Sequence, residues 1–492
     1  MASTTKAKLL FLTSPEAGQA NVQLGTIASI QTLHGEDLDI YLGSFEQLRK
    51  RCPENVTFLP VQGKGMIQHF LEKYDDSNIN NAKEGTLYKH LTTPTGIWGA
   101  IRLAFTFTTI IHSESPEEYV SYAKDVERLI LELEPDFIVC DTIFECGRDA
   151  IKKLGRKCIY LSPNTFKDLA GPQQKTGIFK WPCAGTRYPY PLPWYLYPLN
   201  VFGVIFFVTW LLKYDKRHIE FNKVRNAAGY EDRLPIFQKK DQLRNTFLCV
   251  SHPEVEYPGR IPRWLKLCGP ILLPTPSLEE TDLELYEWVM KRPTILIVLG
   301  THYKTSKELA ENMLISLKIV LEKRRDIQVL WKLQKYGTYD LEGYESDTLS
   351  DDRIKIVSWL NSDPLAVLKT GNVIAFVNHG GSNSYHEGLA TGTPQVLMPA
   401  WVDCYDFAGR VQWLGNGVWG NKGYAPDINQ AQFTKSLFKV VGKTPEDAEA
   451  IQMRDRAKEL ANIVTENGTK QGSVVAAEHI WDELQLELAK KK

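Results

Sequence analysis

Residues 376–406 read FVNHGGSNSYHEGLATGTPQVLMPAWVDCYD, and this stretch decides the fold. An apolar, β-rich run ends at Val377, the pair Gly380-Gly381 follows, and good helix formers begin near Asn383. Because glycine permits the backbone conformations of a tight turn, the pattern predicts a strand, a turn and a helix. The start of that helix would direct unpaired N–H groups and a positive dipole end at the turn, which favours phosphate. The stretch therefore predicts an anion site between a strand and a helix.

Polar and aromatic side chains of the right kinds surround this turn. His379 ends the strand and can donate a hydrogen bond or a positive charge to a phosphate oxygen. Asn383 and Ser384 add short donors, and Ser384 stands three residues before Glu387, which is the spacing of a capping box. Glu387 can accept hydrogen bonds from two ribose hydroxyls. Trp359, twenty positions before His379, offers a flat face on which a base can stack.

These residues and their spacing resemble the donor-sugar signature of the UDP-glycosyltransferases. Each one alone has an ordinary structural explanation, but the set in register, with Asp403 sixteen positions beyond Glu387, favours function. The resemblance implies that Trp359 stacks on uracil, that Glu387 binds the ribose and that Asp403 binds sugar hydroxyls. It also implies a diphosphate site made of His379, Gly381, Asn383 and Ser384. Because Thr301 follows Gly300 as the family's Gly-Ser/Thr element does, Thr301 is expected to bind phosphate too.

Two positions depart from the family pattern. Many members have glutamine directly after the acidic residue, whereas this chain has Cys404. A strong amide donor and acceptor thus becomes a poor one next to the sugar, so the identity of the sugar stays open although glucose is expected. Other members have Pro-Gln shortly after the tryptophan, where this chain has Asn361-Ser362, and we expect this to change only how the base is held.

The composition bounds the class of protein. With 492 residues and 43% apolar content, the chain exceeds one ordinary domain and can bury a sizeable core. Its formal net charge of −1 and the lack of a dense basic tract before the last three residues argue against nucleic acid as a partner. Eight cysteines without Cys-x-x-Cys pairs argue against disulfide scaffolding and structural zinc. No apolar signal core precedes the first expected strand, so we expect a cytoplasmic location.

Residues 188–212 complicate that expectation because they contain no charged residue. Prolines interrupt the first half, and the unbroken part, 199–212, has 14 residues, which is about 21 Å of helix against about 30 Å of hydrocarbon. That is too short to span a membrane, and a buried helix is the interpretation we favour. A wall of the acceptor pocket and an in-plane membrane contact are the alternatives. The second would use as interfacial anchors Trp194, Tyr195, Tyr197 and Trp210.

Apolar strand candidates alternate with helical stretches in both halves of the chain, which predicts α/β architecture with doubly wound parallel sheets. Strands are expected at 8–13, 38–42, 56–59, 137–140, 158–161, 294–299, 329–332, 354–358, 374–377 and 396–398. Two such domains resemble the GT-B fold, in which Rossmann-like domains face an interdomain cleft. We expect an acceptor-binding domain at 1–270, a linker at 271–293, a UDP-sugar-binding domain at 294–470 and a closing helix at 471–492. The sequence of the first half most resembles those of filamentous-fungal members.

Catalytic residues are expected where the two domains meet, because ligands of doubly wound sheets lie beyond the carboxyl ends of the strands. Four loops should therefore converge: those after Thr13, Cys140, Leu299 and Val377. In the family, a histidine in the first loop acts as base and an aspartate after a later strand orients it. Asp141 matches that aspartate, but Gln19 stands where the histidine is expected, and glutamine cannot accept a proton.

Three explanations of this substitution are open. Asp141 acts directly or through a water, with Gln19 positioning the substrate; or Glu16 or His302 serves instead; or the chain binds nucleotide sugar without turning it over. No metal or other cofactor is expected, because the Asp-x-Asp pattern occurs only at Asp37-Leu38-Asp39, at a strand start away from the cleft.

The resemblance implies an inverting enzyme that moves a sugar, with glucose as first choice, from a UDP-sugar to a hydrophobic small molecule such as a phenol or polyketide. The aromatic residues of 182–212 are expected on the acceptor side. Two alternatives remain: a catalytically impaired nucleotide-sugar-binding protein, and a membrane-associated sterol or lipid glycosyltransferase. The sequence leaves O- against C-linkage open.

Overall fold

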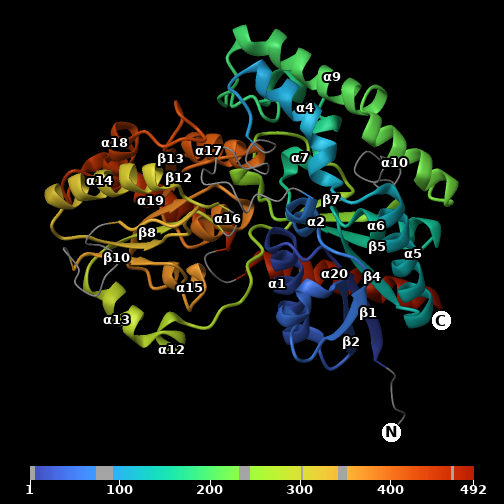
Figure 1. The fold of residues 1–492 in the computed structure, drawn as a ribbon. Helices are drawn as coiled ribbons and strands as arrows, with labels where there is room; N and C mark the ends of the chain where they lie inside the picture. Colours follow the sequence, from blue (N-terminus) through green and yellow to red (C-terminus); the bar gives the residue numbers. More distant parts are fainter. Residues whose placement is uncertain are drawn as a thin grey trace.

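The apolar runs form two parallel sheets in the computed structural model (Figure 1). The structure describes residues 6–73, 92–231, 244–300, 303–341, 352–466 and 470–491. The first sheet has seven strands in the order β3-β2-β1-β4-β5-β6-β7, and the second has six in the order β10-β9-β8-β11-β12-β13. Each sheet with its helices forms one α/β unit, so the expected fold class of two doubly wound domains is confirmed.

The strands of the first sheet are β1 Ala7–Leu12, β2 Leu38–Phe45, β3 Thr57–Val61, β4 Phe137–Asp141, β5 Cys158–Ser162, β6 Thr246–Cys249 and β7 Leu265–Leu267. Those of the second are β8 Thr294–Val298, β9 Gln328–Lys332, β10 Ile354–Val357, β11 Val373–Asn378, β12 Gln395–Leu397 and β13 Gly417–Trp419. Every residue of β4 and of β8 is buried, as expected for strands covered on both faces.

The helices of the first unit are α1 Ala17–His34, α2 Met66–Lys73, α4 Ile97–Ile111, α5 Pro116–Leu133, α6 Glu145–Lys153, α7 Phe166–Ala170, α8 Gly177–Lys180, α9 Tyr197–Lys213 and α10 Lys216–Ala227. The later helices are α12 Leu278–Thr281, α13 Leu283–Lys291, α14 Lys307–Lys323, α15 Pro364–Leu368, α16 Ser382–Ala390, α17 Val402–Leu414, α18 Gln430–Val441, α19 Ala448–Val464 and α20 Gly472–Lys491.

The core of the first unit lies on both faces of its sheet because alternate residues of a strand point to opposite sides. In β1, Leu10 and Leu12 belong to one buried cluster, whereas Leu9 and Phe11 belong to the other. Helix α20 covers the second of these faces, so the end of the chain returns to the first unit (Figure 1).

The stretch expected as linker contains α12 and α13, and α13 packs Leu285 and Val289 into a core cluster with strands of the second sheet. One expectation about a single segment is wrong. Helix α9 is not buried: of its 17 residues only Asn200, Gly203 and Leu211 are. Together with the turn before it, the helix spans Trp194–Lys213 and is, by length and composition, long enough to cross a membrane.

Candidate active site

The ends of β1 and β4 place Thr13 and Asp141 side by side, because these strands are neighbours in the sheet. The Thr13 hydroxyl donates to Asp141 Oδ2 at 3.5 Å, and the backbone N–H of Ile143 donates to Oδ1 at 3.0 Å. Asp141 is fully buried, and this burial raises the pKa of its carboxyl to about 7, with the charge of Glu16 raising it further. A carboxyl in this state can take up and release protons near neutral pH.

The loop after β1 carries the other candidate groups of the first unit. Gln19 lies in the first turn of α1 and is half-buried. Glu16 caps that turn through its carbonyl, and its Oε1 accepts from the backbone N–H of Ile67 at 3.1 Å. Burial raises the pKa of Glu16. The Glu16 carboxyl is therefore tied to the start of α2.

In the second unit, the imidazole of His379 lies between two glycines. A Cβ on Gly300, at the end of β8, would lie 2.7 Å from His379 Cε1, and a Cβ on Gly381 would collide with Nε2. Gly300 has a φ of 90°, which also favours glycine. The ring of Trp401 lies 5.5 Å from the imidazole. Both glycines are thus required for the ring to occupy this place.

The helix after this turn, α16, begins at Ser382 with Gly381 as its N-cap, and no side chain caps it. The expected capping box is therefore wrong, because Ser384 is already the third residue of the helix. The backbone N–H groups of the first turn stay without side-chain acceptors, which is the arrangement that binds anions.

The start of α16 is also where the two units meet. The Asn383 amide donates to the carbonyl of Ala17 at 3.0 Å, and the Ser382 hydroxyl donates to the carbonyl of Pro163 at 2.9 Å. Ala17 opens α1, two residues before Gln19. The loops after β1, β4, β8 and β11 therefore converge at one junction, as expected.

Trp359 follows β10 and Glu387 lies in α16, which follows β11, so both stand beyond the carboxyl ends of strands of the second sheet. Trp359 is 57% exposed, and Lys332 Nζ lies 3.5 Å from the centre of its ring. Glu387 is half-buried in α16, and burial raises the pKa of its carboxyl to about 8, with the charge of Asp363 contributing. Asp363 also acts on Lys332, whose pKa burial lowers. The charge of Asp363 thus acts both on Glu387 and on Lys332, the lysine that lies over the Trp359 ring.

Asp403 and Cys404 lie in the first turn of α17 but differ in burial. Asp403 is exposed, yet the protein around its carboxyl raises its pKa to about 6, and Asp168 of the first unit adds to the effect. Cys404 is fully buried next to Gly380, whose Cβ would lie 3.4 Å from the Cys404 Cβ. Cys404 thus lies in the packing around the turn at Gly380, whereas Asp403 is accessible.

Two expected site residues, Thr301 and His302, lie outside the described residues. Two charged residues near the expected nucleoside site were not predicted from the sequence. Lys332 lies over the Trp359 ring, and the charge of Asp363 acts on Glu387. Lys332 is the last residue of β9. The rule that sites lie at the carboxyl ends of strands was therefore a signal by which it could have been found.

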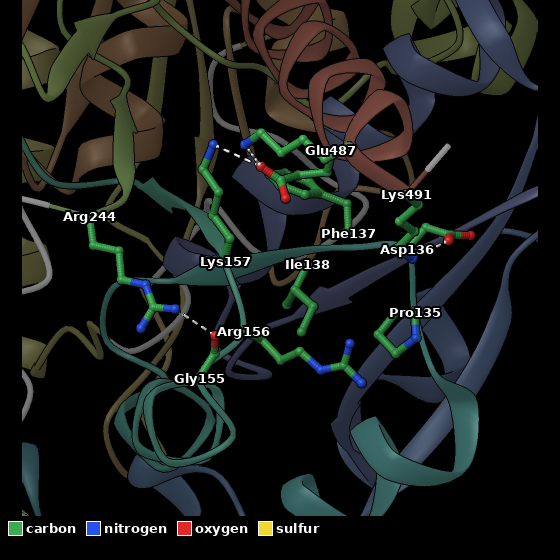
Figure 2. A pocket seen from close by; sticks show the side chains of 11 residues that line it. Pro135, Asp136, Phe137, Ile138, Gly155, Arg156, Lys157, Arg244, Glu487 and Lys491 are labelled. Carbon is green, nitrogen blue, oxygen red and sulfur yellow. Dashed lines mark hydrogen bonds and ion pairs between the residues drawn. The ribbon is translucent and has the colours of Figure 1, made fainter.

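A cavity of about 330 Å³ lies at the amino-terminal ends of strands of the first sheet, away from this site (Figure 2). Phe137 and Ile138, which line it, stand at the amino end of β4, whereas Asp141 stands at the carboxyl end. Several of its charges are paired, as in Lys157 with Glu487 and Lys491 with Asp136. The residues around the cavity therefore help to hold α20 on the first unit.

Comparisons with known proteins agree with this geometry. The family model of the erythromycin biosynthesis protein CIII-like C-terminal domain matches residues 344–463. The glycosyltransferase sdnJ of Sordaria araneosa is 31% identical over 96% of this chain and 97% of its own length. A UDP-glycosyltransferase of Talaromyces amestolkiae is 25% identical over 52% of this chain and 49% of its own length. The solved structure of a UDP-glucosyltransferase from Polygonum tinctorium superposes with a TM-score of 0.62 over 98% of this chain and 99% of that chain, at 14% identity.

Proposed function

Because this chain belongs to the UDP-glycosyltransferase family, we propose that it moves a sugar from a UDP-sugar to a hydrophobic small molecule with inversion at the anomeric carbon. One observation carries the proposal. The hydrogen bond from Asn383 to the carbonyl of Ala17 joins the expected diphosphate site to the first turn of α1, which contains Gln19. This contact supports a site in which donor groups of one unit meet acceptor-side groups of the other.

The second unit supplies the donor side. Trp359 would stack on uracil, Glu387 would accept from the ribose hydroxyls, and His379 with the first turn of α16 would neutralise the diphosphate. The leaving diphosphate carries away the electron pair of the broken carbon–oxygen bond, so these groups stabilise the charge that develops. Asp403 would accept from sugar hydroxyls, and glucose is the first sugar to test.

The first unit supplies the acceptor side. The acceptor oxygen forms the new bond to the anomeric carbon and gives up its proton, for which Asp141 is the proposed recipient. Because Asp141 is fully enclosed, the proton must reach it through an intervening group or water rather than by direct contact. Acceptors that are already acidic, such as phenols, need this help least. We also propose a cytoplasmic location, in keeping with eight free cysteines.

Transfer from a panel of UDP-sugars to phenols and alcohols, read by mass spectrometry, tests this function. UDP binding is measured in parallel by calorimetry. We expect product with UDP-glucose and phenols, and weaker UDP binding, by tenfold or more, in Trp359→Ala and His379→Ala. Trp194→Ala, which changes a 78% exposed tryptophan elsewhere, is the matched control and should bind UDP normally.

A catalytically impaired binding protein is the second candidate, favoured by Gln19 in place of a base. It would bind UDP with the same dependence on Trp359 but give no product with any acceptor. A membrane-associated sterol or lipid glycosyltransferase is the third, favoured by the exposed apolar helix α9. It would transfer sugar to lipid acceptors in vesicles and not to the soluble panel.

A further inference from the structure

Helices α4 and α9 give the first unit an exposed apolar surface, at the top of the view in Figure 1. We call it the α4–α9 surface. Its large side chains are each between 43% and 78% exposed: Trp98, Phe105, Trp194, Tyr195, Leu199, Phe202, Ile205, Val208 and Tyr214. A helix that is apolar all round is normally buried in a core or in a membrane, and a soluble protein seldom exposes so many large apolar groups together.

Small residues let this pair of helices approach closely, and aromatic contacts such as that of Phe107 with Phe207 also join them. A Cβ on Gly203 would lie 3.1 Å from Ile97 Cδ1 and 3.3 Å from Ala100 Cβ, so the two backbones approach closely. Asn200 fixes α9 from below, because its amide donates to the carbonyls of Ile178 at 2.8 Å and Trp181 at 2.9 Å. The helix is thus attached along its length to the folded unit and lies flat on it.

An aromatic row runs along the surface. Phe202, Phe206, Trp210 and Tyr214 follow one another at four-residue spacing, with ring centres 5.8 Å, 6.0 Å and 6.0 Å apart. Phe105 of α4 joins the row, 4.2 Å from Trp210. Trp194 and Tyr195 stand at the start of α9 and Tyr214 directly after its end, which is where aromatic rings accumulate when a helix meets a membrane interface.

The charges around the surface are mostly basic, although Asp215, the N-cap of α10, stands between Lys213 and Lys216. No Asp or Glu occurs between Asp168 and Asp215, or anywhere in residues 92–113. Exposed lysines stand at both ends of the stretch, with Lys175 and Lys180 before it and Lys213 and Lys216 after it. Anionic lipid headgroups would neutralise these lysines, whereas a two-fold contact with a second copy would bring like charges together.

We propose that the α4–α9 surface docks the protein on an anionic lipid bilayer, with α9 lying in the plane of the interface. Spanning is incompatible with the fold, because α9 would have to leave α4 and break the hydrogen bonds of Asn200. The apolar side chains enter the boundary between headgroups and acyl chains, and the terminal lysines contact the headgroups. With the proposed transferase function, this docking would bring the enzyme to the phase in which hydrophobic acceptors dissolve.

Flotation of the full chain with vesicles tests the proposal. Vesicles of phosphatidylcholine alone are compared with vesicles that also contain phosphatidylserine. The variant Phe202→Ser/Ile205→Ser/Val208→Ser removes the apolar contact and should lose at least tenfold in vesicle affinity. The matched control, Leu283→Ser/Ile315→Ser/Leu486→Ser, removes three apolar groups of similar exposure elsewhere and should float like the natural chain.

The headgroup contact has its own variants. Lys213→Gln and Lys216→Gln should each weaken binding to the phosphatidylserine vesicles by about fivefold, and should change little on phosphatidylcholine. Unchanged melting temperatures show that the variants fold. The proposal is overturned if the natural chain floats with neither vesicle, or if the triple variant floats as well as the control. It is also overturned if sedimentation shows a dimer that the triple variant dissociates while vesicles capture nothing, because a second copy would then cover the surface.

Discussion

At the scale of single residues, Asp141 stands out because burial has moved its titration to neutral pH. Its carboxyl receives hydrogen bonds from Thr13 and from the backbone of Ile143, which favour the charged form, but loss of solvent outweighs them. The resulting pKa of about 7 suits a group that must accept a proton and release it again.

We predict that turnover rises with pH through this range. An acid with a pKa of about 7 is ionised to about one tenth at pH 6 and about nine tenths at pH 8, so kcat at saturating donor should rise with a midpoint near 7. Asp141→Asn should lower kcat by about 10²- to 10⁴-fold, remove this limb and leave UDP affinity within about twofold. Rates for a series of phenols of decreasing pKa provide the check, because the loss should shrink as the acceptor becomes more acidic.

The same shift has a consequence for stability, with a definite sign. The folded chain binds the Asp141 proton more tightly than the unfolded chain, so this contribution to stability is present at low pH and is lost as pH rises through about 7. The melting temperature of Asp141→Asn should therefore increase relative to that of the natural chain as the pH is raised from 5 to 8. A rising limb in kcat that persists in Asp141→Asn would assign the proton to another group.

The glycines beside His379 allow a second prediction about single residues. In Gly381→Ala, the added methyl group collides with the imidazole, while the backbone φ of −67° suits alanine. The ring should be displaced and UDP affinity should fall by about tenfold, with little change in melting temperature. Calorimetry with UDP measures this, and Gly18→Ala, whose Cβ meets nothing within 4 Å, is the matched control. Equal UDP affinity in both variants would show that the position of His379 does not matter.

The local pattern around residues 376–406 predicted the strand, the turn and the helix because these depend on neighbours in sequence. It could not predict that Lys332 would lie over Trp359, since that contact joins two strand ends. The capping box failed for a local reason: Gly381, not Ser384, ends the non-helical backbone. The burial of Cys404 depends on the packing of α17 against the turn at Gly380, which one sequence does not reveal.

At the scale of elements, long amphipathic segments were easier to predict than short or uniformly apolar ones. Helix α5 has Ser115 in a capping box, Pro116 at its first position and one apolar face, all of which are start and face signals that a sequence carries. Strands β6, β7 and β13, which have four, three and three residues, were not predicted. Helix α9 was expected in the core because composition records apolarity but not what covers it.

Helix α20 shows how one element stabilises a distant part of the chain, and it supports a third prediction. Ile480 and Leu484 are fully buried against the first sheet and α1, and Trp481 stacks on His34 with ring centres 3.9 Å apart. Ile480→Ala should destabilise the first unit by about 2–5 kcal/mol. Hydrogen exchange should show the loss of protection in α1 rather than in α19. Leu486→Ala, on the same helix but 56% exposed, should change stability by less than about 0.5 kcal/mol.

At the scale of the whole molecule, the alternation of strands and helices was enough to predict two doubly wound units, because each parallel sheet requires helices as crossovers. How the units contact each other was not predictable. The junction is made of side chains far apart in sequence: Arg187 reaches the carbonyl of Ala425 and the hydroxyl of Tyr405, and Lys167 pairs with Asp406. Such contacts depend on the final placement of both units.

The buried ion pair at this junction is the basis of the last prediction. Arg410 of α17 bonds Glu256, which lies between β6 and β7, and the side chains are 1% and 4% exposed. Arg410→Met leaves Glu256 buried without its partner, which should cost about 3–5 kcal/mol in thermal or denaturant unfolding. Burial already raises the pKa of Glu256, so without Arg410 the carboxyl should bind a proton, and the loss of stability should grow as pH rises.

Arg410→Met/Glu256→Leu should recover most of the loss, because no buried charge then lacks a partner. Lys307→Met, which breaks an exposed pair with Glu311, sets the baseline at under about 1 kcal/mol. If Arg410→Met falls within that baseline at every pH, the two units are held in register by their other contacts rather than by this pair.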